Sequence, residues 1–223
     1  MRDAAIEARD LTRATLPSSG SFPVVIDAGD LRQLFSPIVQ SSSARSIYQK
    51  SSRFELGKAL PGLETKGDPL NLSSNAIAPF GLGSYAFDDD GVPAQRVEVV
   101  TNGVFQRPWA DQQSAAYTQL AATGAFANLE IAPGSLGFDE LLSGGPLLYV
   151  RGFSWLTPDP GRGDFSSEIR IGYWIDAKDG VRSREARSAG ISSPGCRMRA
   201  SLARPRWSAT IAGRARCASR GWR

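Results

Sequence analysis

The stretch SYAFDDDGVPAQRVEVVTNGVFQRPW, residues 84–109, decides the fold, because it describes a turn, a hairpin and the approach to a helix. Asp88–Pro93 is rich in turn-forming residues, and Val97–Thr101 is β-branched and strand-like. Asn102-Gly103 is the strongest short-range signal for a two-residue hairpin turn. The return strand is therefore expected to begin at Val104.

A short helix is predicted after this hairpin. Asp111 can cap its first turn, and Ala115, Ala116 and Leu120 are spaced to form one apolar face. Gly124 lies just past the expected end of the helix.

Working outward, the remaining segments predict a strand-rich chain. Residues 1–15 form a charged helical lead-in, residues 22–26 a strand, and Asp27 or Asp30 opens a helix that Pro37 kinks or breaks. Further strands are expected at residues 70–74, 128–132, 147–156 and 169–175, with a bend at Gly152. Short helices are expected near residues 47–48 and at 138–142. Strands joined by tight turns favour an α+β fold with an antiparallel-rich, barrel-like β-sheet and a few short helices.

Three other segments, together with the hairpin, carry a family resemblance. They read LPSSGSFPVVID at residues 16–27, SRFELGKAL at 52–60 and GDFSSEIRIGYWID at 163–176. In this order the four segments resemble the C-terminal domain of the TldD/PmbA family of peptidases, long labelled modulators of DNA gyrase. The match spans residues 16–180 and corresponds to roughly the second half of a full-length member.

The resemblance implies a function in proteolysis. Members of that family pair as heterodimers in which one subunit binds zinc through His-Glu-x-x-x-His plus a Cys, and the pair cleaves extended peptides. This chain is similar to the metal-free, PmbA-like subunit. We therefore expect no cofactor in this chain, zinc only in a partner, and either a zinc-bearing TldD-like partner or a homo-oligomer.

The absence of histidine excludes several chemistries from this polypeptide. Its 223 residues include no histidine and two cysteines. Ser-His and Cys-His nucleophile pairs and His-based zinc motifs are therefore ruled out. Cys196 and Cys217 lack the spacing of a metal knuckle. We accordingly expect no catalytic, cofactor-binding or metal-binding residue here, and whether the chain is an enzyme stays open.

Several suggestive residues have simpler interpretations. Asp88-Asp89-Asp90 reads as a solvated turn rather than a cation site, and the glycine-rich loop at 79–84 lacks a phosphate-binding pattern. Asp164 and Asp176 are not assigned as an acid–base pair. The large aromatic residues of the strands are read as core, with a peptide groove beside an exposed strand edge as the alternative: Trp109, Trp155, Tyr173 and Trp174.

The last 43 residues differ in character from the rest. Residues 181–223 hold 11 Arg and one acid, so they carry +10 while residues 1–180 carry −6. No sustained apolar period is evident, and we expect a basic segment without regular structure. Three interpretations stay open: a nucleic-acid-binding arm, a disordered tail, or a reading frame that changes near residue 181.

The expected organisation is thus a lead-in at 1–15, one TldD/PmbA-type domain at 16–180 and a basic tail at 181–223. Apolar runs such as 23–26 and 146–150 are too short to cross a bilayer, and the N-terminus does not resemble a signal peptide. A cytoplasmic protein with a peptide substrate, no membrane and no specific nucleic acid is expected. The alternative is a truncated, nonfunctional remnant, or a non-enzymatic module that binds peptides or polyanions.

Overall fold

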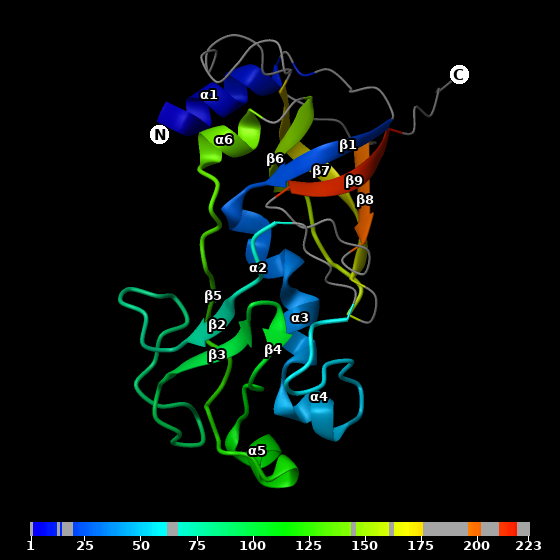
Figure 1. Cartoon of the computed structure of the whole chain (residues 1–223). Helices are drawn as coiled ribbons and strands as arrows, with labels where there is room; N and C mark the ends of the chain where they lie inside the picture. The colour runs from blue at the N-terminus through cyan, green and yellow to red at the C-terminus, as the bar shows by residue number, and fades with distance from the viewer. Residues whose placement is uncertain are drawn as a thin grey trace, which may run out of the picture. The chain divides into compact units, whose positions relative to one another are not determined.

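The fold is seen in a computed structural model that describes residues 2–12, 14, 20–61, 67–143, 146–160, 163–175, 196–201 and 210–217 (Figure 1). The chain divides into two compact units, Met1–Phe35 with Gly134–Arg223, and Ser36–Pro133. The expected domain at 16–180 therefore contributes to both units. Among the described residues, no helix has the length and hydropathy needed to cross a bilayer.

The first unit is built on five strands: β1 (Gly20–Ile26), β6 (Leu147–Phe153), β7 (Asp164–Ile175), β8 (Cys196–Ser201) and β9 (Thr210–Cys217). β1 pairs in parallel with β6 and antiparallel with β9, and β6–β7, β7–β8 and β8–β9 are all antiparallel. The pairings thus run round a small barrel-like sheet (Figure 1). This confirms the antiparallel-rich α+β class that the sequence predicts.

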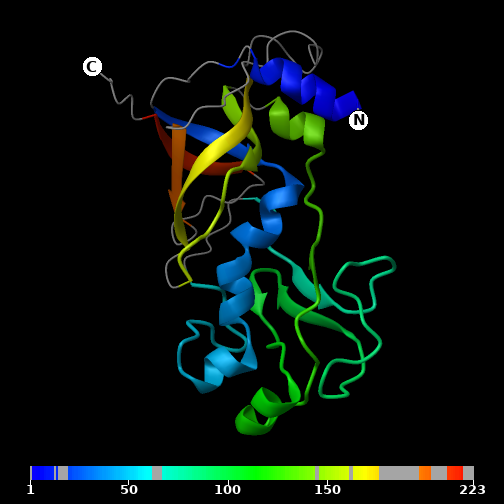
Figure 2. The ribbon, with the colours of Figure 1, turned by 180° about the vertical axis from the view of Figure 1, so that it is seen from behind.

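Short helices accompany this sheet. α1 (Arg2–Leu11) occupies the predicted lead-in and lies beside α6 (Phe138–Leu142) in both Figure 1 and Figure 2. The helix expected after β1 is a 3-10 turn, η1 (Ala28–Asp30), followed by α2 (Leu31–Leu34). The Asp27 side chain caps η1 by accepting a hydrogen bond from the Gly29 N–H, in agreement with one of the two predicted starts.

Buried residues of the strands form the core of the first unit. Val24, Leu148 and Val150 are completely buried, and the rings of Phe153 and Phe165 meet edge to face at 6.1 Å. The predicted bend at Gly152 is present as shifts in the register between β6 and β7 on either side of that residue. A bulge of this kind allows a long hairpin to curve round a barrel-like sheet.

Two stretches of the basic segment are strands in the structure, although the sequence led us to expect no regular structure there. β8 alternates Arg197 and Arg199 with Cys196, Met198 and Ala200. This period of two residues is typical of a strand, but it is too short to form a sustained apolar pattern. The register pairs Cys196 with Cys217 on β9. Residues 181–195, 202–209 and 218–223 lie outside the described residues, so the expectation of a disordered tail is not tested there.

The second unit contains a four-stranded antiparallel sheet in the order β4–β3–β2–β5. Its strands are β2 (Leu72–Asn75), β3 (Arg96–Thr101), β4 (Val104–Phe105) and β5 (Asn128–Ile131). The Asn102-Gly103 hairpin joins β3 to β4, as predicted. Asn102 and Gly103 both have positive φ, 52° and 74°, and this pair of conformations is what the favoured two-residue turn needs.

Three short helices belong to the second unit: α3 (Ser36–Ser41), α4 (Ala44–Tyr48) and α5 (Gln112–Thr118). Asp111 caps α5 as predicted, its carboxylate accepting a hydrogen bond from the Ser114 N–H at 2.6 Å. The helix ends earlier than we predicted, because Gln119 takes the left-handed conformation with φ 56°. Leu120 therefore lies outside the helix and is exposed. Ala116 is exposed as well, so of the three residues predicted to form an apolar face only Ala115 is buried.

Candidate functional site

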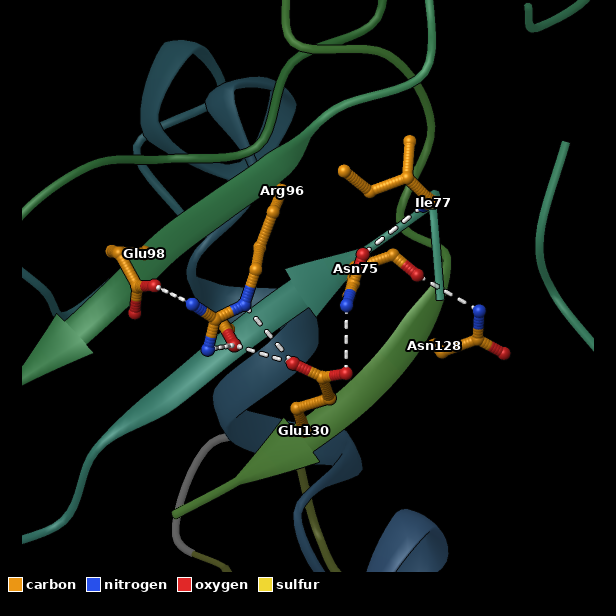
Figure 3. A network of polar contacts seen from close by, with 7 residues as sticks. Asn75, Ile77, Arg96, Glu98, Asn128 and Glu130 are labelled. Carbon is orange, nitrogen blue, oxygen red and sulfur yellow. Dashed lines mark hydrogen bonds and ion pairs between the residues drawn. The ribbon is translucent and has the colours of Figure 1, made fainter. Parts of the chain in front are cut away.

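One face of the second unit's sheet is lined with polar side chains. Along β3 the exposed residues Arg96 and Glu98 alternate with the buried Val97 and Val99, as expected for a strand with one face in the core. In the register of the sheet, Ser73 of β2 lies between Glu98 and Glu130, and Asn75 lies between Arg96 and Asn128. The polar face comprises Ser73, Asn75, Arg96, Glu98, Asn128 and Glu130, and Figure 3 shows this network.

Arg96 lies at the centre of this network (Figure 3). Its guanidinium contacts Glu98 Oε1 at 2.7 Å and Glu130 Oε2 at 3.0 Å, and it donates to Ser73 Oγ at 3.1 Å. One cation thereby connects three strands of the sheet. Because both carboxylates are partly exposed, the network holds the strands in register more than it stabilises the fold.

Glu130 is held in its ionised form. Asn75 Nδ2 donates a hydrogen bond to Glu130 Oε1 at 2.7 Å. This bond, with the hydrogen bond and charge of Arg96, lowers the pKa of Glu130 below its ordinary value. A carboxylate that stays ionised and fully paired is an acceptor of hydrogen bonds and is unsuited to act as a general acid at neutral pH.

Asn128 connects the polar face to the loop between β2 and β3. Its Oδ1 accepts a hydrogen bond from the Gly83 N–H at 2.8 Å, and its Nδ2 donates to Asn75 O at 2.8 Å and to Ser84 Oγ at 2.9 Å. Glycine is favoured where the loop passes this side chain, because a Cβ added at Gly81 would come within 2.6 Å of Ser84 Oγ and closer still to Asn128 Nδ2, so both side chains would have to shift. The sequence gives no sign of this close approach.

The same loop exposes large apolar side chains. Phe80 and Leu82 are as exposed as in an extended chain, at 105% and 103%, and Phe87 and Ile77 are 68% and 60% exposed. Phe80 has a positive φ of 57°, a conformation that is uncommon for a bulky residue. We call this segment, residues 77–90, the apolar loop.

The Asp-rich turn closes the apolar loop. Asp88 Oδ1 accepts hydrogen bonds from the N–H groups of Asp90 and Val92, and its Oδ2 accepts one from Ala125. Gly91 follows with φ 79°. Asp88 is thus a structural turn residue, in agreement with the interpretation as a solvated turn.

The four large aromatic residues considered as core or groove are divided between the two units. Trp109 is half-buried, donating its indole N–H to Val39 O at 2.9 Å and meeting Phe126 at 5.9 Å. Trp155 is 51% exposed, while Tyr173 and Trp174 are half-buried on β7. None of the four is a fully buried core residue, so the core interpretation holds only in part.

The sheet of the second unit has one covered edge and one open edge. Along β4, Gly57 and Leu60 donate backbone hydrogen bonds to Phe105 O and Gly103 O, and Phe105 N donates to Lys58 O. β5 ends the sheet on the other side, and no further described strand pairs with it. The Ala132 N–H bonds inward to Asn71 O, so by alternation the N–H groups of Leu129 and Ile131 face outward.

A second polar cluster lies in the first unit. Asp27 Oδ2 accepts hydrogen bonds from the Tyr149 hydroxyl at 2.6 Å and from Arg151 at 3.1 Å, and Arg151 also pairs with Glu7 of α1 at 2.7 Å. Burial raises the pKa of Asp27, but the bonds from Tyr149, Gly29 and Arg151 outweigh it, so the pKa is lowered overall. Burial, followed by the bond to Asp27, raises the pKa of Tyr149 to about 12. The cluster fastens α1 to the sheet.

The donor set of the described residues does not fit a zinc ion. Those residues contain no group of three or more His, Cys, Asp or Glu side chains placed to hold a metal, and the whole sequence lacks histidine. Asp164 lies exposed at the start of β7, and Asp176 lies outside the described residues.

Residues 19–204 match the family model described as PmbA/TldA metallopeptidase C-terminal domain, and the chain belongs to that family. The match confirms the resemblance seen in the sequence, and it extends beyond residue 181 into the basic segment.

Two curated relatives carry metalloprotease names. The chain is 24% identical over 207 residues to Metalloprotease MJ0996 of Methanocaldococcus jannaschii, with 84% of this chain and 45% of that protein covered. It is 29% identical over 199 residues to a metalloprotease of Methanothermobacter thermautotrophicus, with 82% and 42% covered. The chain thus spans less than half of the length of these relatives.

Solved structures share the fold. A modulator of DNA gyrase from Bacteroides thetaiotaomicron superposes with a TM-score of 0.73 at 19% identity, covering 96% of this chain and 51% of that one. TldE from Thermococcus kodakarensis superposes with a TM-score of 0.72 at 14% identity, covering 90% and 46%. At these identities the likeness establishes the fold alone.

Proposed function

We propose that this chain is the metal-free subunit of a TldD/PmbA-type metallopeptidase system. The observation that carries the proposal is that a domain of a metallopeptidase family contains no histidine. Histidine is the commonest zinc ligand in proteins. The metal, the activated water and the general base would then belong to a zinc-bearing partner subunit, and a homo-oligomer is the alternative assembly. A cytoplasmic location suits these roles.

The contribution of this chain would be to hold an extended peptide. The open edge of β5 offers the outward N–H groups of Leu129 and Ile131, together with the carbonyl groups of the same residues. An extended peptide can satisfy such groups by adding a strand to the sheet. Main-chain pairing of this kind is tolerant of sequence, which suits a system that cleaves extended peptides.

The test is reconstitution with a zinc-bearing homologous subunit. Peptide cleavage should require both chains, and the metal in the mixture should copurify with the partner. The variant Ile131→Pro removes one outward N–H, and proline is tolerated at sheet edges, so it should weaken peptide capture without lowering the melting temperature. Tight stoichiometric zinc in this chain alone, with chelator-sensitive cleavage, would overturn the proposal.

A polyanion-binding function is the second candidate, because residues 181–223 carry a formal charge of +10. Binding of this origin would be independent of sequence and would fall steeply as the salt concentration rises. Titrations of the chain with several unrelated DNA duplexes across a salt series distinguish such binding from sequence-specific binding. Binding to one sequence that persists at physiological salt would identify a specific nucleic-acid arm instead.

A further inference from the structure

The apolar loop is built as a rigid platform. Its backbone is fixed from the sheet by Asn128, which bonds Gly83 and Ser84, and Tyr85 donates its hydroxyl hydrogen to Ala125 O at 2.8 Å. Phe80 and Leu82 nevertheless stay fully exposed. Exposed apolar groups on a preorganised loop lose little further freedom when a partner covers them, and such patches mark interaction sites.

The size of the patch indicates a protein partner. Covering four large apolar side chains, Ile77, Phe80, Leu82 and Phe87, removes on the order of 100–200 Å² each from water. The total of about 400–800 Å² is at least half of the roughly 800 Å² that one partner contributes to a standard protein interface.

The negative charge of the apolar loop indicates that the partner surface is cationic. Residues 77–94 include three Asp and no Lys or Arg. Asp88 is occupied in the turn, while Asp89 and Asp90 are exposed, and no side-chain partner is found for either among the described residues. Two such loops facing each other would bring like charges together, which disfavours contact of the loop with itself.

The same unit carries a complementary surface beside α4. Tyr48 and Tyr117 stack at 4.8 Å and are 55% and 54% exposed. Lys50 and Arg53 follow in exposed positions, and no carboxylate pairs with either in the part of the chain that the structure describes. We call Tyr48, Lys50, Arg53 and Tyr117 the basic patch. The cations of the basic patch can pair with carboxylates or lie over the face of a phenyl ring, and its tyrosine rings can pack against apolar side chains.

We propose that the apolar loop of one copy of this chain docks on the basic patch of a second copy. Within the second unit the two surfaces lie on opposite sides of the sheet, the loop between β2 and β3 on one side and α4 on the other, in both ribbon views (Figures 1 and 2). The contact is therefore head to tail. Such a contact continues from copy to copy until a ring closes, and it does not depend on the peptidase function proposed above.

The test is sedimentation velocity of the intact chain with two complementary variants. Phe80→Ser with Leu82→Ser disables only the loop, and Lys50→Glu with Arg53→Glu disables only the basic patch. The wild type should form species larger than a dimer, and each variant alone should stay monomeric. An equimolar mixture of the two variants should form a dimer and nothing larger, because only one intact contact is left.

The controls keep charge and hydrophobicity matched. Arg32→Glu with Arg170→Glu makes the same charge change outside the second unit, and Leu120→Ser with Leu136→Ser removes exposed apolar groups elsewhere. Both should associate as the wild type does, and loop variants should weaken association at least about tenfold. A monomeric wild type, a mixture that stays monomeric, or an association that all variants retain would overturn the proposal.

Discussion

Asn128 at the start of β5 and Gly83 in the apolar loop are joined by a hydrogen bond of 2.8 Å across 45 residues of sequence. Asn128→Ala removes this acceptor and the two bonds that its amide donates. We expect a loss of about 1–3 kcal/mol in the free energy of unfolding, because partly buried backbone groups lose their partners. Urea denaturation of the variant measures it.

The control for this prediction is Gln106→Ala, an exposed amide in the same unit. It should change stability by less than about 0.5 kcal/mol. Equal stabilities of the two variants would show that the loop is not fastened through Asn128.

Gly81 should be coupled to Asn128, because a Cβ at position 81 would collide with the amide of Asn128 and the hydroxyl of Ser84. Gly81→Ala should cost about 1–3 kcal/mol in the wild type and clearly less in the Asn128→Ala background. A double-mutant cycle measures the difference. Gly152→Ala, where a Cβ has nothing within 4 Å, is the matched control, and strict additivity of Gly81→Ala and Asn128→Ala would contradict the coupling.

The local elements of the fold were accessible from the sequence. The hairpin at Asn102-Gly103, the Asp111 cap and the helix at 138–142 each depend on residues within a few positions of one another. Turn and cap chemistry is local, so it can be read without knowledge of the tertiary structure.

The hydrogen bonds of the apolar loop and of the two polar clusters could not be predicted from the sequence. Strand pairing between distant segments brings Asn128 close to Gly83 and Tyr149 close to Asp27. The type of a residue does not indicate which distant residue it will contact. The end of α5 was also misplaced, because Gln119 adopts a left-handed conformation that the sequence assigns more readily to Gly124. Exposure of Phe80 and Leu82 has no sequence signal at all.

The hairpin turn should be intolerant of a β-branched residue. Gly103 has φ 74°, so Gly103→Val would hold a bulky residue in a left-handed conformation and should cost about 1–3 kcal/mol. Gly103→Asn should cost less, since asparagine visits this region more readily. Thermal melting of the pair decides it, and an unchanged midpoint for the valine variant would contradict the turn.

The Tyr149–Asp27 bond should make stability depend on acid pH. The pKa of Asp27 is lowered in the folded protein, so its contribution is present above its unfolded pKa of about 3.9 and is lost as the pH falls through the lower folded value. Tyr149→Phe keeps the ring against Tyr173 and Phe138 but removes the hydroxyl donor. It should cost about 1–2 kcal/mol near pH 7.

The difference in stability between wild type and Tyr149→Phe should therefore shrink as the pH falls below about 4. Asp30, whose pKa burial raises, contributes in the opposite direction, but it is common to both proteins and cancels in the difference. Urea denaturation at several pH values measures this difference. In an Asp27→Asn background, which retains an oxygen to cap Gly29, the same Tyr149→Phe change should show no dependence on acid pH. A difference that stays constant from pH 7 to pH 3 would mean that the ring packing of Tyr149, rather than its bond to an ionised Asp27, supports the first unit.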